Sequence, residues 1–103
     1  MRAVQRLLPM LNNQEKALLR KAGHQIDKPF LLGKGEVDVS FLSTIDAALK
    51  AHELVKVKLL SSSALKIHDV ATEICAALKA ETVFIVGHTA LIYRPSEKRI
   101  YLK

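Results

Sequence analysis

The sequence predicts an α/β fold of the order α-β-α-β-α-β-β, in which helices pack on a four-stranded mixed sheet. Two observations carry this prediction. Segments with a helical spacing of apolar residues separate the first three strand-like segments, as in crossover connections. The last two strand-like segments are separated only by Gly87-His88-Thr89, which is typical of an antiparallel hairpin.

The first helix is expected to begin at Asn12, because Glu15 three residues later completes the pattern of a capping box. It is expected to stop near residues 23–25, before Lys28-Pro29. Its predicted apolar face consists of Leu18, Leu19, Ala22 and Ile26. A basic stripe on another side consists of Lys16, Arg20 and His24, which are four residues apart.

A short apolar strand is predicted at residues 29–32, and the second helix from near Asp38 to about residue 51. The core side of this helix is expected to hold Phe41, Leu42, Ile45, Ala48 and Leu49. Residues 53–60 then alternate in character, with valines and a leucine on one face and Lys56 and Lys58 on the other. This alternation predicts a half-buried strand with a lysine-bearing outer surface.

Residues 61–63 are three serines, which predict a turn and an N-cap for the third helix. The expected core positions of that helix are Ile67, Val70, Ala71, Ile74, Ala77 and Leu78. Strands are then predicted at 82–86 and 90–93, and a short final strand at 99–102.

The chain has 103 residues, half of them hydrophobic, which fits one folded domain. Its formal charge is +6, and the charge is uneven: +5 over residues 1–34, −2 over 35–93 and +3 over 94–103. The basic ends would form one patch if the fold brings them together, and this favours acidic partners. We expect residues 1–103 to form a single domain, with 1–10 as a loosely ordered N-terminal extension.

The composition also limits the compartment and the kinds of site. Cys75 is the only cysteine, so no intrachain disulfide forms. No apolar run reaches the length of a membrane span, and the start of the chain does not resemble a secretory signal. We therefore expect a cytoplasmic protein without a membrane partner.

The turn Gly33-Lys34-Gly35 lies between the first strand and the second helix. Glycines leave backbone N–H groups uncovered, and a helix N-terminus adds a partial positive charge, so such a turn suits an anion. Lys34 adds a full charge, whereas the next residue, Glu36, is a carboxylate that opposes anion binding. A tight turn with an incidental lysine is the simpler interpretation of the residues alone.

Several motifs together resemble the CRM domain, the chloroplast RNA splicing and ribosome maturation domain, whose stand-alone bacterial form is the YhbY family. They are Leu31-Leu32-Gly33-Lys34-Gly35, His52-Glu53-Leu54-Val55-Lys56-Val57-Lys58, Val86-Gly87-His88-Thr89 and Leu91-Ile92-Tyr93-Arg94-Pro95. No single motif is specific, but their order and spacing are, and the resemblance runs from about Leu11 to Leu102.

The resemblance implies a fold similar to the C-terminal domain of translation initiation factor three. It also implies RNA binding and, for stand-alone members, association with precursors of the large ribosomal subunit. Family members carry a GxxG loop after the first strand, comparable to the loop of KH domains. Here Gly33 matches its first glycine, but Glu36 stands at the fourth position and the second glycine is at 35. The family's usual glycine after the third helix is replaced by Lys79-Ala80-Glu81.

The leading hypothesis is a non-enzymatic RNA-binding protein of ribosome assembly that recognises RNA backbone and shape, because the chain has few aromatic residues. The candidate RNA-binding residues are Gly33, Lys34, Gly35, Lys16, Arg20, Lys21, His24, Lys28, Lys56, Lys58, Arg94 and Arg99. Each basic group has a second interpretation as a solvated surface charge, and strand lysines also discourage edge pairing.

Two other functions stay open. The first is a ribosome-associated protein-interaction module with little direct RNA contact, which the carboxylate of Glu36 favours because it opposes phosphate binding. An enzyme using His52, Glu53 or His88 is disfavoured, because the histidines are scattered without catalytic or metal-ligand spacing. We expect no catalytic residue, metal, cofactor or small-molecule substrate. Cys75 is expected to be a buried or half-buried small hydrophobe, and Tyr93 and Tyr101 to be packing residues.

Overall fold

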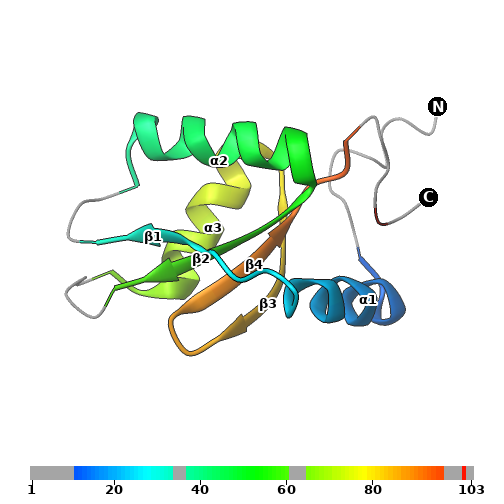
Figure 1. The fold of residues 1–103 in the computed structure, drawn as a ribbon. Coiled ribbons are helices and arrows are strands. Elements are labelled where there is room, and N and C mark those ends of the chain that lie inside the picture. Colours follow the sequence, from blue (N-terminus) through cyan, green and yellow to red (C-terminus); the bar gives the residue numbers. More distant parts are fainter. Residues whose placement is uncertain (1–10, 34–36, 61–64, 97–100, 102–103) are drawn as a thin grey trace.

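The computed structural model describes residues 11–33, 37–60, 65–96 and 101, and it confirms the predicted order of elements (Figure 1). The helices are α1 (Asn13–Gly23), α2 (Val39–His52) and α3 (Ile67–Leu78). The strands are β1 (Phe30–Leu32), β2 (Leu54–Leu59), β3 (Glu81–Val86) and β4 (Thr89–Tyr93).

The strands form one mixed sheet with the order β1-β2-β4-β3. The β1 and β2 strands are parallel and are joined by α2, whereas β4 is antiparallel to both of its neighbours. Strand β4 therefore inserts between β2 and β3, after α3 has carried the chain across the sheet. The C-terminal ends of β1 and β2 and the β3–β4 turn consequently lie at the same end of the sheet. There Leu59 N donates to His88 O at 2.8 Å, and Leu60 N donates to Leu32 O at 3.0 Å.

Helices cover both faces of this sheet, but unequally. On one face α2 and α3 pack over the larger core, which includes Val55, Val57 and Ile92. On the other face α1 packs alone, over a smaller cluster that includes Leu54, Leu91 and Tyr93 (Figure 1). One helix cannot cover a four-stranded sheet, so part of the α1 face remains open.

The helix starts show which local signals decide the boundaries. The Asn12 side chain accepts from Glu15 N at 2.8 Å, while Glu15 Oε1 accepts from Asn12 N at 3.0 Å, so the predicted capping box is confirmed. Asp38 caps α2 by accepting from Phe41 N at 2.8 Å. The serine cap predicted for α3 is wrong: the N-cap is Lys66, which makes no side-chain capping bond. The three serines lie outside the described residues.

The predicted core positions are correct where they face the sheet and wrong at two sites. Leu19 is fully buried, but its neighbour Leu18 is 49% exposed, because α1 contacts the sheet through a narrow stripe. Ala77 is also exposed, near the end of α3. In α2, Ile45 and Leu49 are buried and the other predicted positions are half-buried or packed at the margin of the core.

The β3–β4 hairpin is confirmed, with Gly87 at φ +59° in the first position of a two-residue turn, as in type II′ turns. The register shifts between Thr82 and Phe84, so Val83 forms a bulge. A bulge sets two consecutive residues against one partner residue. Val83 and Phe84 consequently both contribute to the α1 cluster.

The segment after β4 is tied to the start of β2 by a buried carboxylate. Glu53 has a left-handed backbone at φ 68°, and its carboxylate accepts hydrogen bonds from Ser96 N at 2.9 Å, from Ser96 Oγ and from Tyr101 N at 3.3 Å. The final strand predicted at 99–102 falls outside the described residues except for Tyr101, which is not in a strand. Within the described ranges, no helix is long and apolar enough to cross a membrane.

Candidate nucleic-acid interface

A groove opens on the α1 face of the sheet, where α1 ends and leaves the strands uncovered. Its walls are the last turn of α1, the segment that leads from α1 to β1, and the outer faces of β2, β3 and β4, and its volume is about 280 Å³. It brings together four of the basic residues predicted from the sequence: Arg20, His24, Lys56 and Lys58.

Simple periodicities place these four side chains in the groove. Arg20 and His24 are one helical turn apart at the end of α1, and Lys56 and Lys58 are two residues apart in β2. The strand register extends the Lys58 position across the sheet into a row of Leu31, Lys58, Thr89 and Val86. Because α1 does not reach this row, Lys58 is exposed.

Two contacts fix the positions of the groove cations. The Arg20 guanidinium carbon lies 4.1 Å from the centre of the Phe84 ring, within the range of a cation–π interaction. Lys56 Nζ donates to the carbonyl oxygen of Ile26 at 3.1 Å and so holds the segment after α1 against the sheet. Lys56 is therefore half-buried, and the outer face of β2 is less open than the alternation of lysines predicts.

The charge of the groove is largely uncompensated. Within the described part of the chain, the ion pairs involve Asp46 with Lys50 and Arg94, and none involves the three permanent cations of the groove. Asp27 supplies one carboxylate to the lining. The groove therefore presents three permanent cations and one carboxylate to whatever occupies it.

Except for Arg94, the remaining sequence candidates lie near the groove or outside the described residues. Lys16 is one turn before Arg20 on α1, and Lys21 and Lys28 are exposed near the groove without lining it. Gly33 follows β1 at the edge where the strands end, and a Cβ there would lie 3.5 Å from Leu60 Cδ1, an ordinary contact. Three candidates, Lys34, Gly35 and Arg99, and the unfavourable Glu36 fall outside the described residues.

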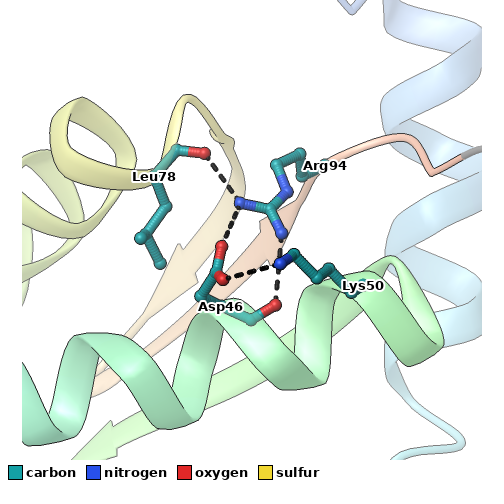
Figure 2. A network of polar contacts seen from close by, with 4 residues as sticks. All are labelled: Asp46, Lys50, Leu78 and Arg94. Atoms are coloured by element: carbon teal, nitrogen blue, oxygen red, sulfur yellow. Dashed lines mark hydrogen bonds and ion pairs between the residues drawn. The ribbon is translucent and has the colours of Figure 1, made fainter.

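Arg94 lies elsewhere. Its Nη1 donates to Asp46 Oδ1 at 2.8 Å and to the Leu78 carbonyl at 2.9 Å, and its Nη2 donates to the Asp46 carbonyl at 3.1 Å (Figure 2). These partners belong to α2 and α3, on the sheet face opposite the groove. Figure 2 shows the guanidinium enclosed between the two helices, and the side chain is only 18% exposed. The structure thus separates Arg94 from the other candidates and assigns it a packing role.

Asp46 and Cys75 have shifted pKa values, and both lie outside the groove. The hydrogen bond from Arg94 lowers the pKa of Asp46 below its ordinary value. Burial raises the pKa of the Cys75 thiol, which lies 3.3 Å from Thr82 Oγ1 on the α2–α3 face. The thiol is half-buried, as predicted, and its raised pKa disfavours the reactive thiolate.

The residues considered for catalysis lie at opposite ends of β2: His52 and Glu53 precede this strand, and the His88 carbonyl accepts from Leu59 N at its far end. Glu53 is committed to the segment after β4, His52 is the last residue of α2, and His88 lies in the hairpin turn. Among the residues that the structure describes, no three His, Cys, Asp or Glu side chains gather as metal ligands would. Tyr93 is buried, as expected of a packing residue.

Sequence reasoning missed several groove residues, chiefly Phe84, Val86 and Asp27. Their positions depend on pairing between strands and on how α1 crosses the sheet. One usable signal was present: Val86 directly precedes the predicted turn Gly87-His88-Thr89, and in the structure it pairs with Thr89, which shortens the turn to two residues. That pairing puts Val86 and Phe84, two residues apart, on one side of β3.

Comparisons with known proteins identify the family. Residues 11–94 match the model of the CRS1 / YhbY (CRM) domain. The chain is 32% identical over 89 residues to the "Probable RNA-binding protein YqeI" of Bacillus subtilis, covering 86% of this chain and 93% of that protein. It is 31% identical over 88 residues to an "RNA-binding protein" of Haemophilus influenzae, covering 85% and 89% of the two chains.

A solved structure agrees with these matches. The solution structure of the hypothetical protein SAV1595 from Staphylococcus aureus, described as a candidate RNA-binding protein, superposes with a TM-score of 0.67 at 31% identity. The similarity covers 91% of this chain and 98% of that one. The chain belongs to the CRS1 / YhbY (CRM) domain family, which confirms the resemblance drawn from its motifs.

Proposed function

We propose that this CRM-family protein binds structured RNA through the groove at the end of α1. The observation that carries the proposal is the convergence of Arg20, Lys56 and Lys58, from two separate elements, without compensating ion pairs among the described residues. Phosphates neutralised by such cations release counterions, which supplies affinity independent of sequence. The names of the homologues, which describe RNA-binding proteins, support the same ligand.

The proposed biological role is association with large-subunit ribosomal RNA or its precursors during ribosome assembly, in the cytoplasm. The protein would act by binding alone, without catalysis or a cofactor. Gly33 follows β1, whose Leu31 lies opposite Lys58, so the backbone amides of the predicted glycine turn would extend the contact along the RNA. Lys16, which lies one turn before Arg20 on α1, would extend the RNA contact toward the start of that helix.

The direct test is RNA affinity measured by fluorescence anisotropy with a fragment of large-subunit ribosomal RNA across a range of salt concentrations. The double variant Lys16→Glu/Arg20→Glu should lower affinity more than tenfold, because it replaces two phosphate contacts with repulsion. Wild-type affinity should fall steeply with salt. A flat salt dependence would contradict the proposal, and retained protein partners with unchanged RNA affinity would favour the protein-interaction alternative.

A matched pair of single substitutions separates the groove from general surface charge. Lys58→Gln removes a groove charge, and Lys50→Gln removes a charge from α2, where the lysine side chain pairs with Asp46 and is 74% exposed. Lys58→Gln should reduce the slope of log affinity against log salt by about 0.7 to 0.9. Lys50→Gln should leave that slope unchanged.

The ribosomal role has its own test, which is cross-linking in cells followed by sequencing of the attached RNA. Recovery of large-subunit ribosomal RNA at one discrete position is the expected result. Recovery spread over messenger RNAs would contradict the assembly role while leaving RNA binding intact.

A further inference from the structure

The groove is only partly a phosphate-binding surface, because much of its lining is apolar. Ile26 and Pro29 form one wall, and Phe84, Leu91 and Val86 contribute to the opposite side. Val86 is 58% exposed, so this apolar side chain is accessible to a ligand in the groove. Phosphates gain nothing from apolar surface, whereas the faces of unstacked bases do.

The Arg20–Phe84 pair is suited to receive a base. Guanidinium planes and aromatic rings are the two surfaces on which proteins stack unpaired bases. The contact at 4.1 Å already holds the exposed Arg20 side chain over the ring, so less conformational entropy is lost when a ligand orders it. Arg20 thus offers a positioned planar group, whereas a lysine would offer only a charge.

The charges of the groove orient the nucleotide. Asp27 repels phosphate, but its carboxylate can accept a hydrogen bond from an N–H group on a base edge. Lys58 lies in the most open row of the sheet, toward the edge where Gly33 follows β1. The base therefore belongs on the Asp27 side and the phosphates belong beside Lys58.

The size of the cavity limits its contents. At about 280 Å³ it is at the lower limit of small-molecule pockets and is too small to admit a duplex. From these observations we infer that the groove holds one unpaired nucleotide of the bound RNA, with its base stacked on Arg20, which Phe84 supports, and its phosphate beside Lys58. This inference rests on the proposed RNA binding and adds the kind of RNA: a helix with a bulged or otherwise unpaired base.

The test compares two RNA hairpins that differ at one position. In one, a 2-aminopurine is bulged; in the other, the same base is paired. Wild-type protein should bind the bulged hairpin about five- to a hundredfold more tightly, the range expected for stacking one base. The 2-aminopurine fluorescence should change on binding only in the bulged hairpin.

Two variants locate the base. Phe84→Leu should lower affinity for the bulged hairpin more than affinity for the paired hairpin, and so reduce the preference for the bulge. Because Phe84 also packs against the α1 cluster, the second variant is Arg20→Lys, at an exposed position. It keeps the charge, so the salt dependence should not change, but the preference for the bulge should fall severalfold.

The outcomes separate the two proposals. Equal wild-type affinity for both hairpins, or a bulge preference that survives both substitutions, overturns the unpaired-nucleotide site while RNA binding stands. Failure to bind either hairpin at low salt overturns the proposed function itself.

Discussion

Arg94 and Arg20 lie on opposite faces of the same sheet and differ in what surrounds the guanidinium group. Arg94 donates to one carboxylate and two backbone carbonyls between α2 and α3, and little of it is exposed. Arg20 is exposed, and its guanidinium lies over the aromatic ring of Phe84. On the face covered by two helices, Arg94 is engaged in packing contacts within the protein. On the face covered by one helix, Arg20 remains accessible to a ligand.

The most direct test of this difference between the two faces is to replace each arginine in turn. Arg94→Met should lower the free energy of unfolding by about 2 kcal/mol, because the Asp46 and Leu78 carbonyls lose a charged donor. Arg20→Met should cost at most about 1 kcal/mol, the range of an exposed cation–π contact. Urea denaturation measures both.

RNA affinity should show the opposite order. Arg20→Met should weaken binding, and folded Arg94→Met should bind like the wild type. If both variants lost affinity equally, the separation of the two faces would be wrong.

The next largest effect on stability is expected at Gly23, and it contrasts with the small effect expected at Gly33. A Cβ at Gly23 would lie 2.5 and 2.9 Å from the Leu91 methyl carbons, and Leu91 is buried. Overpacking of this kind costs about 1–3 kcal/mol, while alanine gains up to about 1 kcal/mol in helix propensity. Gly23→Ala should therefore destabilise by about 1 kcal/mol, as measured by urea denaturation.

Gly33→Ala should leave stability within about 0.5 kcal/mol, since the new methyl group has room. Its RNA affinity should nevertheless fall severalfold, because a side chain hinders the approach of the backbone to phosphate. Unchanged affinity would show that the turn does not contact RNA and that the groove binds alone.

A smaller effect is expected at Lys79, a basic residue that ends α3 with a left-handed backbone at φ 57°. Glycine is favoured there because it has no Cβ, so Lys79→Gly should stabilise the protein by about 0.5 kcal/mol. Lys79→Ala retains the Cβ and serves as the control, with no gain expected in thermal denaturation. Neither change should alter RNA binding, even though each removes a positive charge.

The smallest effect concerns pH. Because the pKa of Asp46 is lowered in the folded state, the folded protein favours its ionised form. The resulting stability is present above the ordinary pKa of aspartate, about 3.9, and is lost as pH falls through the lower folded value. Urea midpoints measured between pH 5 and 2 should fall more steeply in the wild type than in Asp46→Asn. Parallel curves would contradict the coupling to Arg94.

The sequence predicted what depends on neighbours along the chain. The capping box at Asn12, the alternation in β2 and the glycine turn of the hairpin are local patterns, and each is found in the structure. The fold class followed from their order. The boundary of α3 was predicted less well, since its N-cap, Lys66, uses no side-chain bond.

The site was predicted only in part, because its composition depends on contacts between distant segments. Residue type alone does not distinguish Arg94 from Arg20. Their roles differ because Arg94 contacts Asp46 and Arg20 contacts the Phe84 ring. Leu18 and Leu19 likewise differ only in where α1 meets the sheet. The helical spacing did identify Arg20 and His24 as neighbours, and the strand alternation did identify Lys56 and Lys58.

The buried carboxylate of Glu53 bears on how much chain is needed to fold. The family match ends at residue 94, yet Glu53 accepts hydrogen bonds from Ser96 and Tyr101, beyond that boundary. A protein shortened to the matched residues would lose these donors and the segment that contacts the carboxylate, and we expect it to be less stable than the whole chain. Ser96 and Tyr101 thus contribute to the fold although the family model ends before them, and a shortened or fused version of the protein should be cut after residue 101.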